Sequence, residues 1–161
     1  PRYIFGNKKS IKKMNFLQKI YSRFQDLNKI DNDYTKRKFI AKLYLKKLSP
    51  LLKNKIISIP GLYEFNNNYD MTGLSVFYQI PVICNDPDKL IDFLVKNNID
   101  IARQHIKNLA NCKAYKNYSN EEFVNAQEIS KKLILLPCYP ELHSKNVLKI
   151  SNFILKFYSI K

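Results

Sequence analysis

The chain has 161 residues, 45% of them hydrophobic, three cysteines and a formal net charge of +15. This length suits one domain that needs no disulfide or structural metal, and an odd number of cysteines without a CxxC pair favours a reducing compartment. No apolar run approaches the roughly 20 residues of a membrane helix, and no signal peptide is recognised. We therefore expect a cytoplasmic protein that does not span a membrane.

The first third of the chain is strongly basic. Residues 1–55 hold sixteen of the 28 Lys and Arg residues but three of the 13 Asp and Glu residues. Such a segment attracts polyanions through its long-range field, whereas most charge runs are simply solvated faces. A chain rich in Lys, Ile and Asn favours the second interpretation, and a nucleic-acid surface stays open as the alternative.

Residues 1–13 are expected to form an irregular basic lead-in, and residues 14–161 a single domain. From Met14 onward apolar residues recur at spacings of three and four, which predicts a long helical segment. The polar residues 31–33 are expected to divide it into two helices, with Asp33 capping the second. Ser49 and Pro50 should end the segment, because the residue before proline avoids the helical region.

Short strands are expected next. Residues 56–59 form an apolar run, residues 63–72 read as a loop, and residues 74–84 are the best strand pattern in the chain. Pro81 within that strand indicates an edge position or a bulge. A helix should then begin after an Asp86 cap with Pro87 at its first position, and a further strand is expected over residues 99–105.

A helix is expected to begin within residues 119–122 after a loop over residues 106–119. Its predicted inner side consists of Phe123, Ala126, Ile129 and Ser130. Residues 133–136 predict a short buried strand, and Pro137 and Pro140 turn the chain into a last helix capped by Ser144. The expected fold class is α+β: a small mixed or antiparallel sheet of three to four short strands covered by helices and preceded by a long helical segment.

Few residues point to catalysis. The sequence has no P-loop, GxGxxG or HExxH motif, and no set of ligands that would hold a metal. Arg103 and His105 lie before a long loop, where binding residues often occur, and His143 is expected to face solvent. The three cysteines are expected to be small buried hydrophobes, and the helical spacing of the aromatics in residues 16–48 favours core packing over base stacking.

Four segments follow one another along the chain: YQIPVIC, NDPDKLIDFLVKNNIDI, a His-containing loop and FVNAQEISKKLILLPCYPEL. This order resembles the C-terminal small domain of the DegT/DnrJ/StrS family of sugar aminotransferases. Residues 136–142 resemble the family's Leu-Pro-x-x-Pro-x-Leu. Upstream, Lys36-Arg37, Ala41 and Tyr44 match a family helix in register.

The resemblance implies a fold type I enzyme that uses pyridoxal phosphate. The family's large domain, with the Schiff-base lysine, has no counterpart here, so no catalytic residue is expected and we expect the isolated chain to bind no cofactor. Asn7 and Lys13 take the place of family residues near the cofactor phosphate. Arg103 and His105 are the residues expected to face the substrate.

The resemblance implies three connected roles for the chain. It would be the C-terminal domain, a split half or a remnant of a nucleotide-sugar aminotransferase of cell-surface polysaccharide biosynthesis. It would help to close over the nucleotide sugar and supply contacts to a homodimer or a large-domain polypeptide. A small basic module that binds nucleic acid or protein without enzymatic activity is the alternative, and a remnant without any ligand is the third.

Overall fold

The computed structural model describes residues 27–65, 68–70, 77–101, 108–113, 115, 118 and 123–159. Contacts divide the chain into residues 1–32 and 33–161. Of the first unit only the beginning of one helix is described, so the following concerns the second. The predicted boundary between residues 13 and 14 lies outside the described residues and stays a prediction.

The first described helix, α2, runs from Leu27 to Lys53 without interruption. The break predicted at residues 31–33, with Asp33 as a cap, is therefore wrong, because Asp and Asn each cost only about 0.7 kcal/mol or less inside a helix. The end predicted at Ser49 and Pro50 is also wrong. Pro50 cannot donate to the carbonyl of Lys46, but the Ser49 hydroxyl donates to that oxygen at 3.0 Å, so the helix continues.

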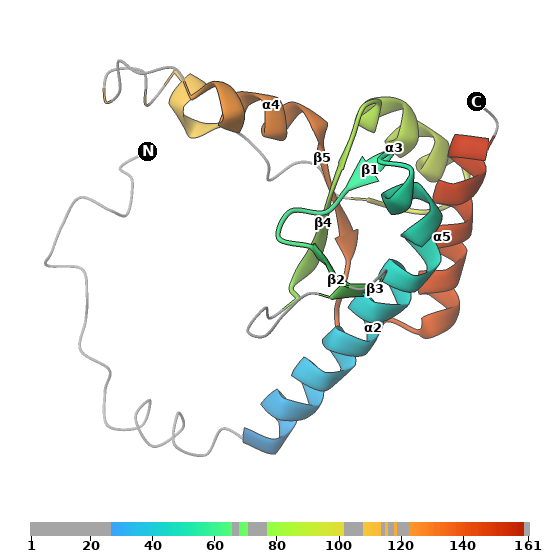
Figure 1. Ribbon diagram of the computed structural model, residues 1–161. Helices are drawn as coiled ribbons and strands as arrows, with labels where there is room; N and C mark the ends of the chain where they lie inside the picture. Colours follow the sequence, from blue (N-terminus) through green and yellow to red (C-terminus); the bar gives the residue numbers. More distant parts are fainter. Residues whose placement is uncertain are drawn as a thin grey trace, which may run out of the picture. The chain divides into compact units, whose positions relative to one another are not determined.

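Three antiparallel strands form the sheet in the order β1-β4-β5 (Figure 1). They are β1 (Ile57–Ser58), β4 (Gln79–Cys84) and β5 (Leu133–Pro137). Ile80 lies opposite Leu136 and Val82 opposite Ile134, and all four side chains are buried. The strand predicted over residues 133–136 is confirmed, with alternate rather than complete burial.

The other face of the same two strands is half-buried. It carries Gln79 opposite Pro137, Pro81 opposite Leu135 and Ile83 opposite Leu133, and we call these six residues the outer sheet face. Five of the six are apolar. This face therefore keeps apolar surface that the described helices do not fully cover.

Pro81 lies in the central strand but at a place that resembles an edge. β1 pairs only with Ile83 and Cys84, so among the described strands β4 has a neighbour on one side only at Pro81. A proline is tolerated there because no bond to β1 is lost. The described strand begins at Gln79, five residues later than predicted, and residues 71–76 lie outside the described residues.

Where they are described, two connecting segments differ from the expectations. The loop predicted over residues 63–72 contains a hairpin of β2 (Tyr63–Phe65) and β3 (Asn68–Asp70), whose aromatic residues favour extended backbone. In the strand predicted over residues 99–105, the described residues 99–101 are not in a strand. A short 3-10 helix, η2 (Leu109–Asn111), follows.

Two further helices complete the layer over the sheet. α3 (Pro87–Lys96) follows Asp86 as predicted, although the Asp86 carboxylate makes an ion pair with Lys89 at 3.3 Å and no capping bond. α5 (Ser144–Ser159) begins one position earlier than a Ser144 cap requires, because the His143 carbonyl already accepts from the first turn. The Phe93 ring of α3 packs on Phe153 and Phe157 of α5, with ring centroids 6.2 and 5.6 Å apart.

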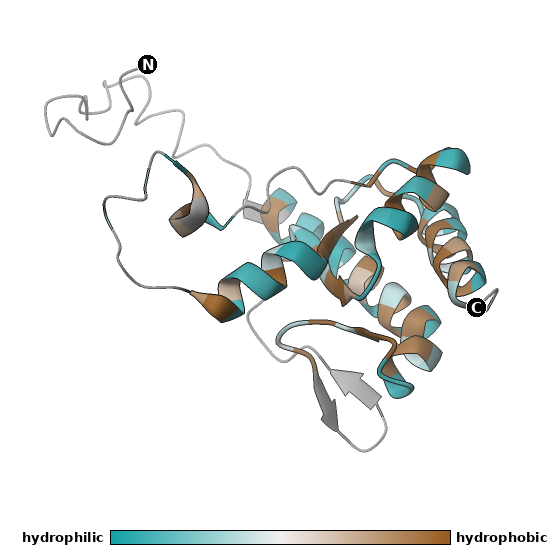
Figure 2. Ribbon diagram, turned by 90° about the horizontal axis from the view of Figure 1, so that it is seen from above, coloured by the Kyte–Doolittle hydropathy of each residue, from teal (hydrophilic) through white to brown (hydrophobic). Residues whose placement is uncertain are grey.

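The core lies between α2, α3, α5 and the buried face of the sheet. Figure 2 shows the apolar residues of these helices along one side of each. Its largest fully buried side chains include Tyr44, Leu48, Ile80, Leu90, Leu94, Ile134, Leu136 and Ile154. The predicted α+β fold with three short strands and a long leading helix is thus confirmed.

The remaining helix, α4 (Val124–Lys132), contributes nothing to this core. None of its residues is buried, and it leads directly into β5 (Figure 1). The predicted inner side is wrong, because Phe123, Ala126 and Ile129 are exposed and Ser130 is only half-buried. The predicted helix is present, but no described element packs against α4 closely enough to bury its apolar residues.

Candidate functional site

All four residues predicted to bind cofactor or substrate lie outside the described residues. Asn7 and Lys13 fall in residues 1–26, and Arg103 and His105 in residues 102–107. Their roles stay predictions. His143 is described, and it is exposed in the turn before α5 as expected.

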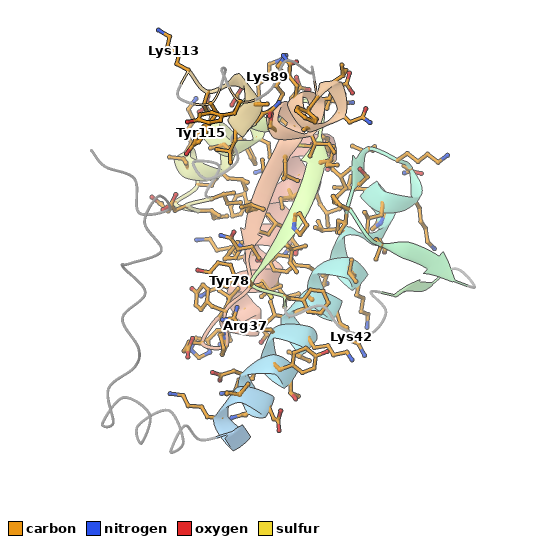
Figure 3. The ribbon with its side chains drawn as sticks, turned by 90° about the vertical axis from the view of Figure 1, so that its left-hand side faces the viewer. Arg37, Lys42, Tyr78, Lys89, Lys113 and Tyr115 are labelled. Atoms are coloured by element: carbon orange, nitrogen blue, oxygen red, sulfur yellow. The ribbon has the colours of Figure 1, made fainter. Side chains whose placement is uncertain are left out.

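Arg37 is the polar centre of the described structure. Its Nη1 donates to the carbonyl oxygens of Phe77 at 3.2 Å, of Tyr78 at 3.4 Å and of Cys138. The guanidinium carbon also lies 5.6 Å from the centroid of the Tyr78 ring, as Figure 3 allows the reader to follow. Arg37 thus ties α2 to the chain before β4 and to the chain after β5, and we call these four residues the Arg37 junction.

Cys138 makes a second hydrogen bond within the Arg37 junction. Its thiol donates to the carbonyl oxygen of Arg37 at 3.4 Å, so the two residues bond each other reciprocally across 101 positions of the sequence. Burial raises the pKa of Cys138 to about 11, against the opposing charge of Arg37. At neutral pH the group is a thiol and not a nucleophilic thiolate.

Tyr44 lies two helical turns after Arg37 and is completely buried. Burial, together with Cys138 and Tyr139 nearby, raises its pKa well above the usual value. Its hydroxyl has no hydrogen-bond partner among the described residues. Tyr44 therefore remains neutral and is not suited to transfer a proton.

Tyr158 is similarly held in its neutral form. Burial is the largest cause that raises the pKa of Tyr158, and the nearby Cys84 thiol and Asp86 carboxylate raise it further. The Cys84 thiol itself is buried and donates to the Lys132 carbonyl at 3.7 Å. Neither tyrosine nor either buried cysteine fits the role of an activated nucleophile.

Alkylation should distinguish the three cysteines. Cys112 is half-buried, whereas Cys84 and Cys138 are buried, so we expect iodoacetamide to modify Cys112 first and the other two only on global unfolding. Mass mapping after a short reaction at pH 8, with and without urea, measures this order. Early labelling of Cys138 in the absence of urea would contradict the closed Arg37 junction.

The described residues do not fit pyridoxal phosphate. A lysine that forms a Schiff base lies in a desolvated pocket, but every described lysine is exposed except Lys38, which is half-buried with its ammonium 5.8 Å from the Tyr34 ring centroid. The described part of the chain also holds no group of three His, Cys, Asp or Glu residues that could bind a metal. None of its helices is long and apolar enough to cross a membrane.

Comparison with known proteins identifies the family. The profile of the DegT/DnrJ/EryC1/StrS aminotransferase family matches residues 13–155, which is most of the chain, so the chain belongs to this family. A comparison with curated protein sequences gave no match.

Solved aminotransferases share the fold. DesV from S. venezuelae, solved in complex with a ketimine intermediate, is 20% identical with a TM-score of 0.67, over 88% of this chain and 34% of its own. PseC from Helicobacter pylori, involved in the biosynthesis of pseudoaminic acid, is 19% identical with a TM-score of 0.68, over 92% and 38%. Ntda from Bacillus subtilis, solved with bound PMP, is 16% identical with a TM-score of 0.62, over 77% and 28%.

The chain therefore spans about a third of the length of these relatives. The residues that carried the resemblance meet at one place: Arg37 and Cys138 bond each other, and Tyr44 and Ala41 are buried on the same side of α2. These motif residues hold the fold together. The sequence had marked them only as part of a family pattern, because a contact across 101 positions leaves no local signal.

Proposed function

We propose that the chain is the small-domain portion of a pyridoxal phosphate-dependent nucleotide-sugar aminotransferase of cell-surface polysaccharide biosynthesis. The observation that carries this proposal is the family match over residues 13–155, combined with a span of about a third of the solved relatives. A portion of this size with no described lysine in a desolvated pocket fits a part that closes over the substrate. The reacting lysine would belong to the remainder of the enzyme, in the cytoplasm.

The basic character of the chain supports a nucleotide-sugar substrate. A formal net charge of +15 would attract the diphosphate of such a substrate at long range. In this proposal Arg103 and His105 face the substrate, Asn7 and Lys13 lie near the cofactor phosphate, and the domain supplies contacts to a homodimer or a large-domain polypeptide. Pyridoxal phosphate would supply the electron sink for amino transfer.

Cofactor absorbance tests the division of labour. We expect residues 1–161 alone, mixed with pyridoxal phosphate, to show no Schiff-base absorbance band. Borohydride reduction of this mixture should accordingly give no stable adduct at a single lysine. The same chain co-expressed with the polypeptide encoded directly upstream should show that band, with the adduct on the upstream polypeptide. A single stoichiometric adduct within residues 1–161 would show that the chain carries its own reacting lysine and would overturn the proposal.

The nucleic-acid alternative gains no support from the described residues. Arg37, one of the basic residues of the first third, is engaged with three carbonyl oxygens and a ring. Lys36 and Lys42 are exposed on α2, as expected for solvated positions. No observation on the described residues favours this second function over the first.

A further inference from the structure

α4 presents an apolar face that the rest of the described domain does not bury. Phe123, Val124 and Ile129 are 46%, 56% and 43% exposed, and Ala126 between them is exposed as well. We call these four residues the α4 face. Phe123, Ala126 and Ile129 recur every three residues, which is the pattern of a helix side that packs against another surface.

The α4 face continues into a second apolar surface. α4 ends at Lys132, and Leu133 is both the first residue of β5 and part of the outer sheet face. The helices α2, α3 and α5 place their buried residues in the core on the other side of the sheet, so none of them is available to cover these surfaces. The two apolar surfaces are therefore joined along the chain at Lys132 and Leu133. Large exposed apolar patches on soluble proteins usually bind a partner.

The length of the solved relatives indicates which partner would cover these two surfaces. Roughly two thirds of each of the three solved aminotransferases lies outside the match to this chain. In a single enzyme that larger portion has to pack against the smaller one, and a packed interface needs an apolar core. The described surface offers that core at the α4 face and the adjoining outer sheet face.

We propose that the α4 face and the outer sheet face are the surface on which the cofactor-bearing portion of the aminotransferase docks. The inference rests on the proposed function and adds to it the residues that carry the interface. Phe123, the residue before α4, and Ile129 within it are its anchors, because they carry two of the bulkiest exposed apolar side chains of the α4 face. Covering them removes the exposed apolar surface that the isolated domain leaves in water.

Charged substitutions at exposed apolar positions test the docking surface. The probe is the polypeptide encoded directly upstream of Pro1, co-expressed with tagged residues 1–161 as wild type, as Phe123→Glu/Ile129→Lys, and as the matched control Phe39→Glu/Val95→Lys. Phe39 and Val95 are 60% and 53% exposed but lie on α2 and α3. We expect the α4 variant to weaken association at least about 30-fold, as loss of an interface anchor does, and the control to stay within about threefold of wild type.

The outcomes separate the docking surface from the proposed function. The urea midpoints of both variants alone should equal that of wild type, because all four positions are exposed. If the upstream polypeptide binds all three chains equally and forms the cofactor band, the docking surface is wrong and the proposed function stands. If it binds none and no band forms, both are overturned. If wild type alone dimerises by sedimentation and only the α4 variant dissociates, a second copy is the occupant and the docking proposal is wrong.

Discussion

Tyr44→Ala should be among the most destabilising single changes in the described core, with a loss of about 4 kcal/mol in the free energy of unfolding. The Tyr44 side chain of α2 is completely buried in the core, and deletion of a large buried aromatic side chain removes its transfer free energy and leaves a cavity. Urea unfolding followed by circular dichroism measures the change. The ring lies beside the Arg37 junction, so the cavity also loosens the packing behind Cys138.

Tyr44→Phe is the matched control and should have the opposite sign. It keeps the ring but removes a buried hydroxyl that has no partner among the described residues, so the protein should be unchanged or more stable by up to about 1 kcal/mol. A loss of more than about 1 kcal/mol in this variant would show that the hydroxyl makes a hydrogen bond in solution. In that case part of the Tyr44→Ala effect would belong to that bond.

Arg37→Ala should destabilise the protein by about 3 kcal/mol. The change removes the shared charged donor of three carbonyl oxygens, and hydrogen bonds to charged groups are worth about 1.5–3 kcal/mol each before solvent screening reduces them. It also removes the cation–π contact with the Tyr78 ring. The urea midpoint and the loss of hydrogen-exchange protection at the ends of β4 and β5 are the measurements.

Two variants make the Arg37 result specific. Arg37→Lys should recover only part of the stability, because an ammonium group has neither the planar fork nor the flat face of a guanidinium. Lys36→Ala, at the exposed neighbouring position, should stay within about 0.5 kcal/mol of wild type. If Arg37→Ala also changes the free energy of unfolding by less than about 1 kcal/mol, the Arg37 junction does not stabilise the fold as described above.

Elements with a complete set of local signals could be predicted from the sequence. Pro87 at the first helical position and the two asparagines at residues 97 and 98 define α3, whose C-cap is Asn97, and the apolar run before Pro137 defines β5. α5 follows from its stripe of Val147, Ile150 and Ile154, all buried. In these segments local preference and tertiary packing agree.

The wrong predictions in α2 concern positions where a local helix-breaking signal is outweighed by the stability of the whole helix. The acidic and amide residues at 31–33 resemble a helix start, yet their small cost is overcome by the continuous helix around them. Pro50 resembles a helix end because it cannot donate a backbone hydrogen bond. The hydroxyl of Ser49 donates instead to the Lys46 carbonyl oxygen that proline leaves without its helical donor. Hydrogen bonds between specific neighbours are not visible in apolar periodicity.

The Arg37 junction was beyond sequence reasoning for a different reason. Arg37 looked like one more cation in a basic segment, and only the fold brings it to residues 77, 78 and 138. The exposure of the α4 face could not be foreseen either. An amphipathic pattern indicates that one side of a helix favours an apolar contact, but it does not say which surface provides that contact.

The direct passage from α4 into β5 has a mechanical consequence. No loop separates Lys132 from Leu133, and the far end of β5 is fastened to α2 through Cys138 and Arg37. A force on α4 therefore has no slack to take up before it pulls on the strand. A displacement of α4 should therefore act directly on β5, and the hydrogen bonds between Arg37 and Cys138 are the contacts that would resist it at the far end of the strand.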